Sequence, residues 1–317
     1  MENAAQNGKH VTAFVELKAR FDEGKNISWS KRLERAGVIV VYGIAHLKVH
    51  AKVMLVIRRE DNIIRRYVHL ATGNFNENTA KNYSDISLLT SNSEIANDVT
   101  LFFNMITGYS AIQTMKCLKM APIDLKTKLL DLINREIKRT SKQNPGRIVA
   151  KMNSLSDPEI ISALYKASCA GVEILLNVRG ICMLVPGVKG MSENITVISI
   201  VDRYLEHSRI FYFKNGGSEE VYFSSADWMP RNLEKRVELM VPVLQDSIRK
   251  TVIQMLKVYF MDTEKAKVLQ SDGFWIDKPV QKNEKTLRAQ EDFYDNAKTR
   301  ASAQKVQPKQ EFVVRRK

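Results

Sequence analysis

The fold is decided by the stretch LEHSRIFYF at residues 205–213, because the chain carries a counterpart, KVHAKVMLV, at residues 48–56. In each stretch a histidine, a small residue and a basic residue open an apolar run with the composition of a buried strand. Upstream of each histidine triplet, another predicted strand ends close to an arginine, Arg20 or Arg179. The same order of features in both halves indicates an internal repeat.

The predicted elements around these stretches alternate between helix and strand. In the first half we expect a helix over residues 29–36 and strands over 11–17, 38–44, 50–58 and 63–72. In the second half we expect helices over 124–142, 158–170 and 242–260 and strands over 147–152, 172–178, 197–201, 209–213 and 221–224. The pattern predicts an α/β fold of two repeated domains, 1–114 and 115–277, and a basic, partly helical tail, 278–317.

The two repeats are unequal at their starts. The second has a strand over residues 147–152 and a helix over 158–170 before its central strand, whereas the first has only residues 2–8 there. We therefore expect the first repeat to lack its N-terminal strand and the chain to be a truncated form of a longer protein. The incomplete half-sheet would then expose a strand edge.

The composition is globular, with a surplus of positive charge. Of the 317 residues, 44% are hydrophobic and 26% are charged, which excludes a wholly disordered chain. The formal net charge is +14 and the isoelectric point is about 9.6. This balance favours an anionic partner such as a phosphate, a nucleotide, a nucleic acid or an acidic lipid, the simpler alternative being a solvated basic surface.

Three cysteines in no CxxC pair argue against a disulfide framework or a zinc site and favour a reducing, cytoplasmic location. The polar first residues do not resemble a secretory signal, and the longest apolar stretch, residues 36–45, is too short to span a bilayer. We expect at most peripheral membrane association. P-loop, GxGxxG, HExxH and protein-kinase signatures are absent, so ATP, if bound, is not held by the usual loop.

Two of the five histidines, His50 and His207, occupy equivalent places in the repeat. Because residues i and i+2 of a strand share a face, Lys52 should lie beside His50 and Arg209 beside His207. A neutral imidazole supplies a lone pair for attack on phosphorus, and the cation neutralises the phosphate oxygens. Two such half-sites facing each other would form one site, in which the second histidine handles a proton or the leaving oxygen.

Two arginines and a tyrosine are further candidates. Arg20 and Arg179 end equivalent strands, at the strand ends where ligands gather in open α/β sheets. Paired arginines suit bidentate phosphate contacts, whereas surface ion pairing is the alternative that their repetition disfavours. Tyr83, followed by Asp85, could stack on or bond to a nucleotide, with simple packing as the alternative.

The two histidine triplets resemble those of the phospholipase D superfamily. Hydrolases of that superfamily carry His-x-Lys followed, after four residues, by Asp. Here the corresponding positions are Ile57 in the first copy and Lys214 in the second, and the second triplet has Arg209 in place of Lys. These departures disfavour a phosphodiesterase.

Longer strings are similar to the two C-terminal catalytic domains of the bacterial polyphosphate kinase family. They are ELKARFDEGKNISWSKRLERAGV, LKVHAK, ATGNFNENTAKNYSD, VRGICMLVPGVKGMSENITVISIVDRYLEHSRI and VYFSSADWMPRN. The resemblance implies a phospholipase D-like fold and reversible transfer of the terminal phosphate of ATP to polyphosphate through a phosphohistidine. By this resemblance the phosphorylated histidine falls on His50, the second active-site histidine on His207, and the ATP contacts on Tyr83, Arg179 and His207.

The resemblance also implies Mg²⁺, with an arginine beside the magnesium-bound phosphate that falls on Arg20. Since a cation is no ordinary metal ligand, Arg20 would bind the phosphate that carries the metal. Lys52 and Arg209 would help to spread the charge of the transferred phosphate. The implied partners are ATP, ADP and inorganic polyphosphate, with no nucleic acid, and the family's full chain forms a homo-oligomer with two further N-terminal domains.

These features are compatible with three functions. The leading one is a catalytic fragment of an ATP–polyphosphate phosphotransferase. The second is a non-catalytic module, left by truncation, that binds polyphosphate or nucleotide without forming a phosphohistidine. The third, a phospholipase D-like phosphodiesterase or nuclease, is disfavoured by Ile57 and Lys214.

Overall fold

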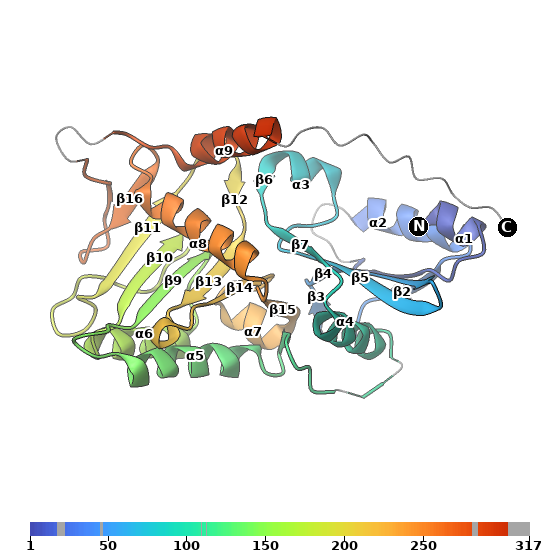
Figure 1. Ribbon diagram of the computed structural model, residues 1–317, viewed down its shortest axis with the longest axis horizontal. Coiled ribbons are helices and arrows are strands. Elements are labelled where there is room, and N and C mark those ends of the chain that lie inside the picture. The colour runs from blue at the N-terminus through green and yellow to red at the C-terminus, as the bar shows by residue number, and fades with distance from the viewer. Residues whose placement is uncertain (18–22, 45–46, 109, 112, 281–284, 304–317) are drawn as a thin grey trace.

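The computed structural model describes residues 1–17, 23–44, 47–108, 110–111, 113–280 and 285–303 (Figure 1). The first half contains α1 (Glu2–Gln6), β1 (Thr12–Val15), α2 (Glu23–Arg35), β2 (Ile39–Tyr42), β3 (Lys48–Val49), β4 (Lys52–Glu60), β5 (Ile63–Ala71), α3 (Glu77–Asn82), β6 (Tyr83–Ser84), β7 (Ser87–Thr90) and α4 (Ser93–Ile106).

The second half contains β8 (Lys119–Ala121), α5 (Leu125–Arg139), β9 (Arg147–Met152), α6 (Pro158–Cys169), β10 (Glu173–Val178), β11 (Ile195–Ile200), β12 (Leu205–Glu206), β13 (Arg209–Phe213), a 3-10 turn (Asn215–Gly217), β14 (Glu220–Ser224), α7 (Pro230–Lys235), β15 (Arg236–Pro242), α8 (Asp246–Met261), β16 (Ala266–Leu269), β17 (Trp275–Asp277) and α9 (Ala289–Ala303).

The largest sheet has the strand order β17-β16-β11-β10-β9-β13-β14-β15-β3, with β8 paired to β15. Strands β9, β10 and β11 are parallel, β13 is antiparallel to both β9 and β14, and β14 is antiparallel to β15. Helices α5 and α6 cover one face and α8 lies on the other (Figure 1). On α5 the buried residues Leu125, Leu129, Leu132 and Ile133 recur at helical spacing, and they pack on this sheet as the sequence pattern predicted.

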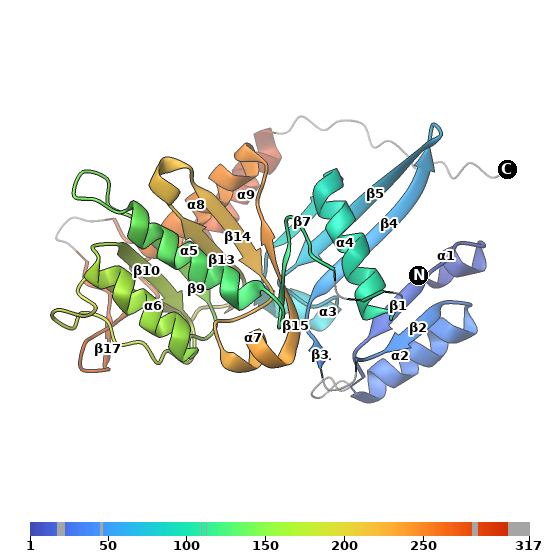
Figure 2. The same ribbon diagram turned by 90° about the horizontal axis from the view of Figure 1, so that it is seen from below.

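The first half repeats part of the second, but among the described residues it has no strand in the place of β9. In the second half β9 lies between β10 and β13, whose counterparts in the first half are β1 and β4. No described strand lies between those two: β1 pairs only with β2, and β4 belongs to a separate sheet, β4-β5-β7. Figure 2 shows the β1–β2 unit set apart from the long β4–β5 hairpin. The prediction of two α/β repeats, the first lacking its N-terminal strand, is confirmed.

Each half contributes a short strand to the other. Strand β3 of the first half pairs in parallel with the start of β15, and β12 of the second half pairs in parallel with β6. A hydrophobic core also crosses the boundary, joining Val99 and Phe102 of α4 to Ile210 and Phe223 of the second-half sheet. The two repeats are therefore packed against each other at the segments that carry the histidines.

Each histidine lies two residues before the strand that its triplet opens. Strand β4 begins at Lys52, two residues after the predicted start at His50, whereas β13 spans Arg209–Phe213 as predicted. The reason is that the backbone N–H of His50 donates to the carbonyl of Val237 at 2.9 Å, and that of His207 donates to Ser84 at 3.0 Å. The backbone N–H of each histidine thus donates its hydrogen bond to a residue of the other half of the chain.

Other boundaries also differ from the predictions. The helix expected over 242–260 begins only at Asp246, because Pro242 ends strand β15. Helix α2 begins at Glu23, before the predicted start at Trp29. Helix α5 begins one residue after its predicted start at Asp124, whose carboxylate accepts from the N–H of Met120 at 2.8 Å and makes no side-chain cap.

Helix α4 was not predicted. It begins after Asn92, whose side chain accepts hydrogen bonds from the backbone of Glu94 and Ile95, in a regular N-cap. Among the described residues, no helix combines the length and apolar character needed to cross a membrane. The cysteines Cys117, Cys169 and Cys182 are free.

Candidate active site

His50 lies between β3 and β4, with its ring held by a buried carboxylate of the other half. Its Nδ1 is 2.9 Å from Oε2 of Glu238, which is 0% exposed, and the other carboxylate oxygen accepts from the Asn232 amide at 2.8 Å. Burial lowers the pKa of His50, although Glu238 opposes that shift. A neutral ring that donates its Nδ1 proton to Glu238 keeps its lone pair on Nε2.

His207 is held in the same way by the first half. Its Nδ1 is 2.8 Å from Oδ1 of Asp85, which also accepts from the Thr72 hydroxyl at 2.7 Å. Gly73 permits this approach, since a Cβ there would lie 2.2 Å from a carboxylate oxygen of Asp85. Burial lowers the pKa of His207, and its Nε2 lies 3.1 Å from the Nη1 donor of Arg209.

The two arrangements are related by the repeat. In the register of the short strands, Lys48 is paired with Arg236 and Leu205 with Tyr83. His50 and Glu238 each come two residues after the paired Lys48 and Arg236. In the same way, His207 and Asp85 come two residues after the paired Leu205 and Tyr83. Each half therefore supplies one histidine and the carboxylate that orients the other half's histidine.

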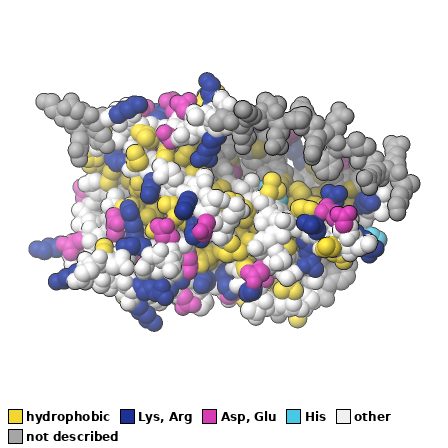
Figure 3. Space-filling model, in the orientation of Figure 1, with side chains coloured by type: hydrophobic (Ala, Val, Ile, Leu, Met, Phe, Trp, Pro, Cys, Tyr) yellow, Lys and Arg dark blue, Asp and Glu magenta, His cyan; other side chains and the backbone are white. Residues whose placement is uncertain are grey.

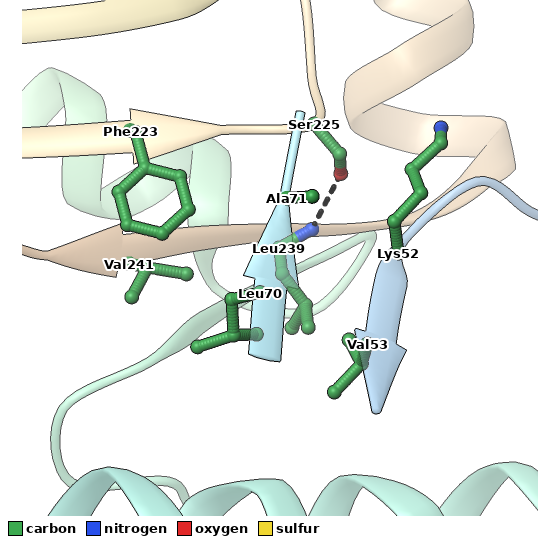
Figure 4. A pocket seen from close by; sticks show the side chains of 8 residues that line it. All are labelled: Lys52, Val53, Leu70, Ala71, Phe223, Ser225, Leu239 and Val241. Atoms are coloured by element: carbon green, nitrogen blue, oxygen red, sulfur yellow. Dashed lines mark hydrogen bonds between the residues drawn. The ribbon is translucent and has the colours of Figure 1, made fainter. Parts of the chain in front are cut away.

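Lys52 is the cation nearest to the first half-site in sequence. Its amine donates to the backbone carbonyl of His50. Figure 4 shows Lys52 at the start of β4, its amine directed away from apolar side chains that line a cavity of about 10 Å³, such as Val53 and Val241. Burial lowers the pKa of this amine to about 7, with Glu238 opposing the shift. Near neutral pH the Lys52 amine is therefore only partly protonated, and the charges around it decide how much of it is charged.

Arg209 is fixed by a carboxylate and reaches His207 with its remaining nitrogen. Its Nε and Nη2 donate to the two carboxylate oxygens of Asp227 at 3.2 and 3.1 Å. Burial alone would raise the pKa of Asp227, but the Arg209 guanidinium lowers it below its usual range. The fork geometry holds the charge of Arg209 beside both histidines, whose pKa values it lowers.

Arg179 and Tyr83 also lie beside His207. The Nε of Arg179 donates to the carbonyl of Glu206 at 2.8 Å and to Asn153 at 3.2 Å. Its two terminal nitrogens make no hydrogen bond or ion pair to any described residue, so they are free to meet a ligand. The Tyr83 ring lies 5.0 Å from that of His207, tilted by 58°. Arg20, the predicted counterpart of Arg179, lies outside the described residues.

The sequence did not identify the carboxylates that orient the histidines. Glu238 was not considered, and Asp85 was noted only as a neighbour of Tyr83. A signal exists: each acid stands fourteen residues after the end of a strand, β5 for Asp85 and β14 for Glu238. The sequence analysis also missed Arg236. This half-buried residue precedes Glu238 by two positions, as Tyr83 precedes Asp85 in the first half.

Comparison with known proteins agrees with this fold. Residues 1–112 match the family model described as polyphosphate kinase C-terminal domain 1, and residues 118–290 match that of C-terminal domain 2. The chain is 51% identical over 313 residues to a polyphosphate kinase of Rhodopirellula baltica, covering 99% of this chain and 37% of that protein. It is 53% identical over 273 residues to one of Synechocystis, covering 86% and 38%.

Solved structures show the same relationship. The polyphosphate kinase of Porphyromonas gingivalis superposes with a TM-score of 0.87 at 43% identity, covering 95% of this chain and 46% of that one. A phosphatidylserine synthase of Haemophilus influenzae, at 8% identity and a TM-score of 0.50, shares the fold alone. The chain thus spans about two fifths of the curated relatives named above. It belongs to the polyphosphate kinase family and corresponds to that family's two C-terminal domains.

Proposed function

We propose that the chain is an ATP–polyphosphate phosphotransferase that works through a phosphohistidine at Nε2 of His50. The observation that carries this proposal is the contact between Nδ1 of His50 and the buried Glu238 carboxylate. It leaves Nε2 as the atom with a lone pair, in a ring whose pKa is lowered by burial. A neutral, oriented imidazole is the form of histidine that can attack phosphorus.

The first step transfers the γ-phosphoryl group from ATP to His50. Nε2 donates its electron pair to the γ-phosphorus, and the bond from that phosphorus to the β–γ bridging oxygen breaks, so that ADP leaves with the electron pair. The ring becomes positively charged, and Glu238 stabilises this charge at Nδ1–H. The cations Lys52, Arg179 and Arg209 are placed to balance the phosphate oxygens.

The second step transfers the phosphoryl group to the terminal phosphate of polyphosphate. An oxygen of that phosphate attacks, the bond from phosphorus to Nε2 breaks, and His50 recovers its lone pair. Reversal of both steps would make ATP from ADP. His207, whose Nδ1 faces Asp85 and whose Nε2 accepts from Arg209, is placed to hold the Arg209 guanidinium toward a phosphate oxygen rather than to carry a charge itself.

Magnesium enters this proposal as part of the nucleotide substrate. In the described ranges, no group of three or more His, Cys, Asp and Glu residues could hold a metal ion. The carboxylates next to the histidines are each bonded to a histidine or an arginine. The described side chains therefore fit a magnesium–nucleotide through its phosphates, and bound Mg²⁺ would supply further charge neutralisation there. Arg20 stays a proposed phosphate contact.

The substrates of this proposal are ATP, ADP and inorganic polyphosphate. Figure 3 shows Lys and Arg side chains on the face in view interspersed with Asp and Glu, so the positive surplus there is dispersed. The concentrated cations are those around the histidines, where Lys52, Arg179, Arg209 and Arg236 lie half or fully buried. Cytoplasmic location and homo-oligomer assembly stay predictions.

We also propose domain boundaries at 114/115 and 277/278, with the tail docked on the second domain. The alternative of a binding module without catalysis is favoured by one observation, the split first-half sheet, in which β1 and β4 do not pair. The phosphodiesterase reading has less support, since Ile57 is 57% exposed on the hairpin and Lys214 bonds to the carbonyl of Pro145.

Incubation with γ-labelled ATP and Mg²⁺ separates these functions. We expect acid-labile, alkali-stable label on the protein, its loss in His50→Ala and its retention in His10→Ala, which replaces an exposed histidine. Nucleotide binding without label in the folded protein would favour the binding module. Release of product from a chromogenic phosphodiester would instead support the phosphodiesterase.

A further inference from the structure

The chain after the second domain returns to the segment that carries His207. Helix α9 lies across the end of β12 (Figure 1). Three alternate residues of that segment, Asp202, Tyr204 and Glu206, are each bonded by Arg288 or Gln290. Arg288 holds Asp202 through Nε and Nη2 at 3.0 and 2.6 Å.

Gln290 binds the segment at two residues. Its Oε1 accepts from the backbone N–H of Tyr204 at 3.0 Å, and its Nε2 donates to the Tyr204 carbonyl at 2.9 Å. The same Nε2 donates to Oε1 of Glu206 at 2.7 Å. The Gln290 amide therefore pairs with the chain as a strand would and also fixes a carboxylate next to His207.

Glu206 connects this contact to the site. Its residue is 2% exposed, its Oε2 lies 3.1 Å from the amine of Lys151, and its carbonyl accepts from Nε of Arg179 at 2.8 Å. Lys151 in turn donates to the hydroxyl and carbonyl of Ser208 at 2.9 and 3.1 Å. The residues on both sides of His207, together with Arg179, are thus held by one buried network.

The tail itself is fixed at the point where α9 begins. The backbone N–H of Ala289 donates to Oδ2 of Asp262 at 2.7 Å, and both residues are 0% exposed. The Phe293 ring packs on Tyr259 of α8 with 5.0 Å between centroids. Gln290 is therefore presented from a rigid helix start rather than from a loose terminus.

We propose that Gln290 is a positioning residue, which acts through Glu206 to set Arg179 and His207 for the phosphates of the nucleotide. The inference rests on the proposed function, in which these two side chains meet ATP. The alternative is that the tail only adds stability to the second domain. The two differ in what happens to nucleotide affinity when the polar contacts are lost but the helix stays docked.

The test compares Gln290→Met with Asn296→Met. The first keeps side-chain volume and removes the hydrogen bonds to Tyr204 and Glu206, whereas the second removes an exposed amide of the same helix that donates to Asp292. ADP with Mg²⁺ is titrated by calorimetry, and the histidine ring signals are followed by NMR, with His207 assigned from His207→Ala. We expect the Kd of Gln290→Met to rise roughly tenfold, the effect of losing one hydrogen bond to a charged group, with shifted His207 signals and label still formed at saturating ATP.

In Asn296→Met the Kd and the ring signals should match those of the unchanged protein. Unchanged affinity and unchanged His207 signals in folded Gln290→Met would overturn the proposal. So would a smaller labelled fraction at unchanged Kd, which is the signature of stability alone. If the unchanged protein neither binds ADP nor becomes labelled, the proposed function fails, and the His207 ring signals of Gln290→Met still decide whether Gln290 positions that residue.

Discussion

Nδ1 of His50 lies 2.9 Å from the carboxylate of Glu238, a residue 188 positions later in the chain. The pair is repeated in reverse by His207 and Asp85, at 2.8 Å and 122 positions apart. Neither half therefore contains a complete histidine site. Catalysis by the proposed mechanism requires that the two repeats pack as a unit, with β3 on β15 and β6 on β12.

Replacing Glu238 by Gln should slow phosphohistidine formation by roughly 100-fold, because the developing positive charge on the His50 ring loses its counter-charge. Single-turnover labelling at saturating ATP measures this rate. Glu234→Gln, which alters a half-exposed acid on the neighbouring helix α7, is the matched control and should label at the original rate. Equal rates in the two variants would remove Glu238 from the mechanism.

A methyl group at position 73 should disturb the second half-site. In Gly73→Ala the added Cβ would meet the Asp85 carboxylate, which must then move away from His207. We expect nucleotide affinity to fall about as much as in Asp85→Asn. Gly24→Ala, where no atom of the described residues lies within 4 Å of the added Cβ, should leave affinity unchanged. A calorimetric titration with ADP that gives the same Kd for Gly73→Ala and Gly24→Ala would contradict this reading of the site.

The pH profile of labelling at low ATP concentration should be bell-shaped. Attack needs neutral His50, whose pKa is lowered by burial, so the rate should rise with pH through that lowered value. Phosphate binding needs the charged amine of Lys52, whose pKa is lowered to about 7, so the rate should fall again as pH rises through about 7. Lys52→Arg keeps its charge and should lose the descending limb. An unchanged descending limb in that variant would assign it to another group.

The buried pair of Lys151 and Glu206 should be strongly coupled in stability. Burial lowers the pKa of Lys151 and Glu206 opposes that shift. Lys151→Met alone leaves the Glu206 carboxylate without its cation and should reduce the free energy of unfolding by about 3 kcal/mol. Adding Glu206→Gln should recover part of that loss. Urea unfolding of the single and double variants checks this, and additive losses would show that the pair is not coupled.

The sequence predicted the parts of this molecule that local pattern controls. Apolar runs located β9, β13 and the β4–β5 hairpin, and the repeated histidine triplets located His50 and His207. What it missed depends on pairing between distant segments. The helix was predicted from residue 242, but Pro242 ends β15, and this strand, residues 236–242, which pairs with β14 and β8, was not predicted.

The missing parts of the site have the same cause. Glu238 looks like any polar residue of a strand until β15 is placed beside β3, and Gln290 lies in a segment that read as a basic tail. Both act across the fold, on residues 188 and 84 positions away. Of these two residues, only Glu238 could have been found from the sequence. The repeat indicates it, because Asp85 and Glu238 follow the ends of equivalent strands at the same distance.

The most direct test of the account is to locate the phosphate on the histidine ring. After labelling with ATP and Mg²⁺, ³¹P and ¹⁵N NMR of the protein, or of the peptide that contains residue 50, distinguishes a phosphate on Nε2 from one on Nδ1. The contact of Nδ1 with Glu238 predicts phosphate on Nε2 of His50 alone. Phosphate on Nδ1 of His50, or on His207, would contradict the account.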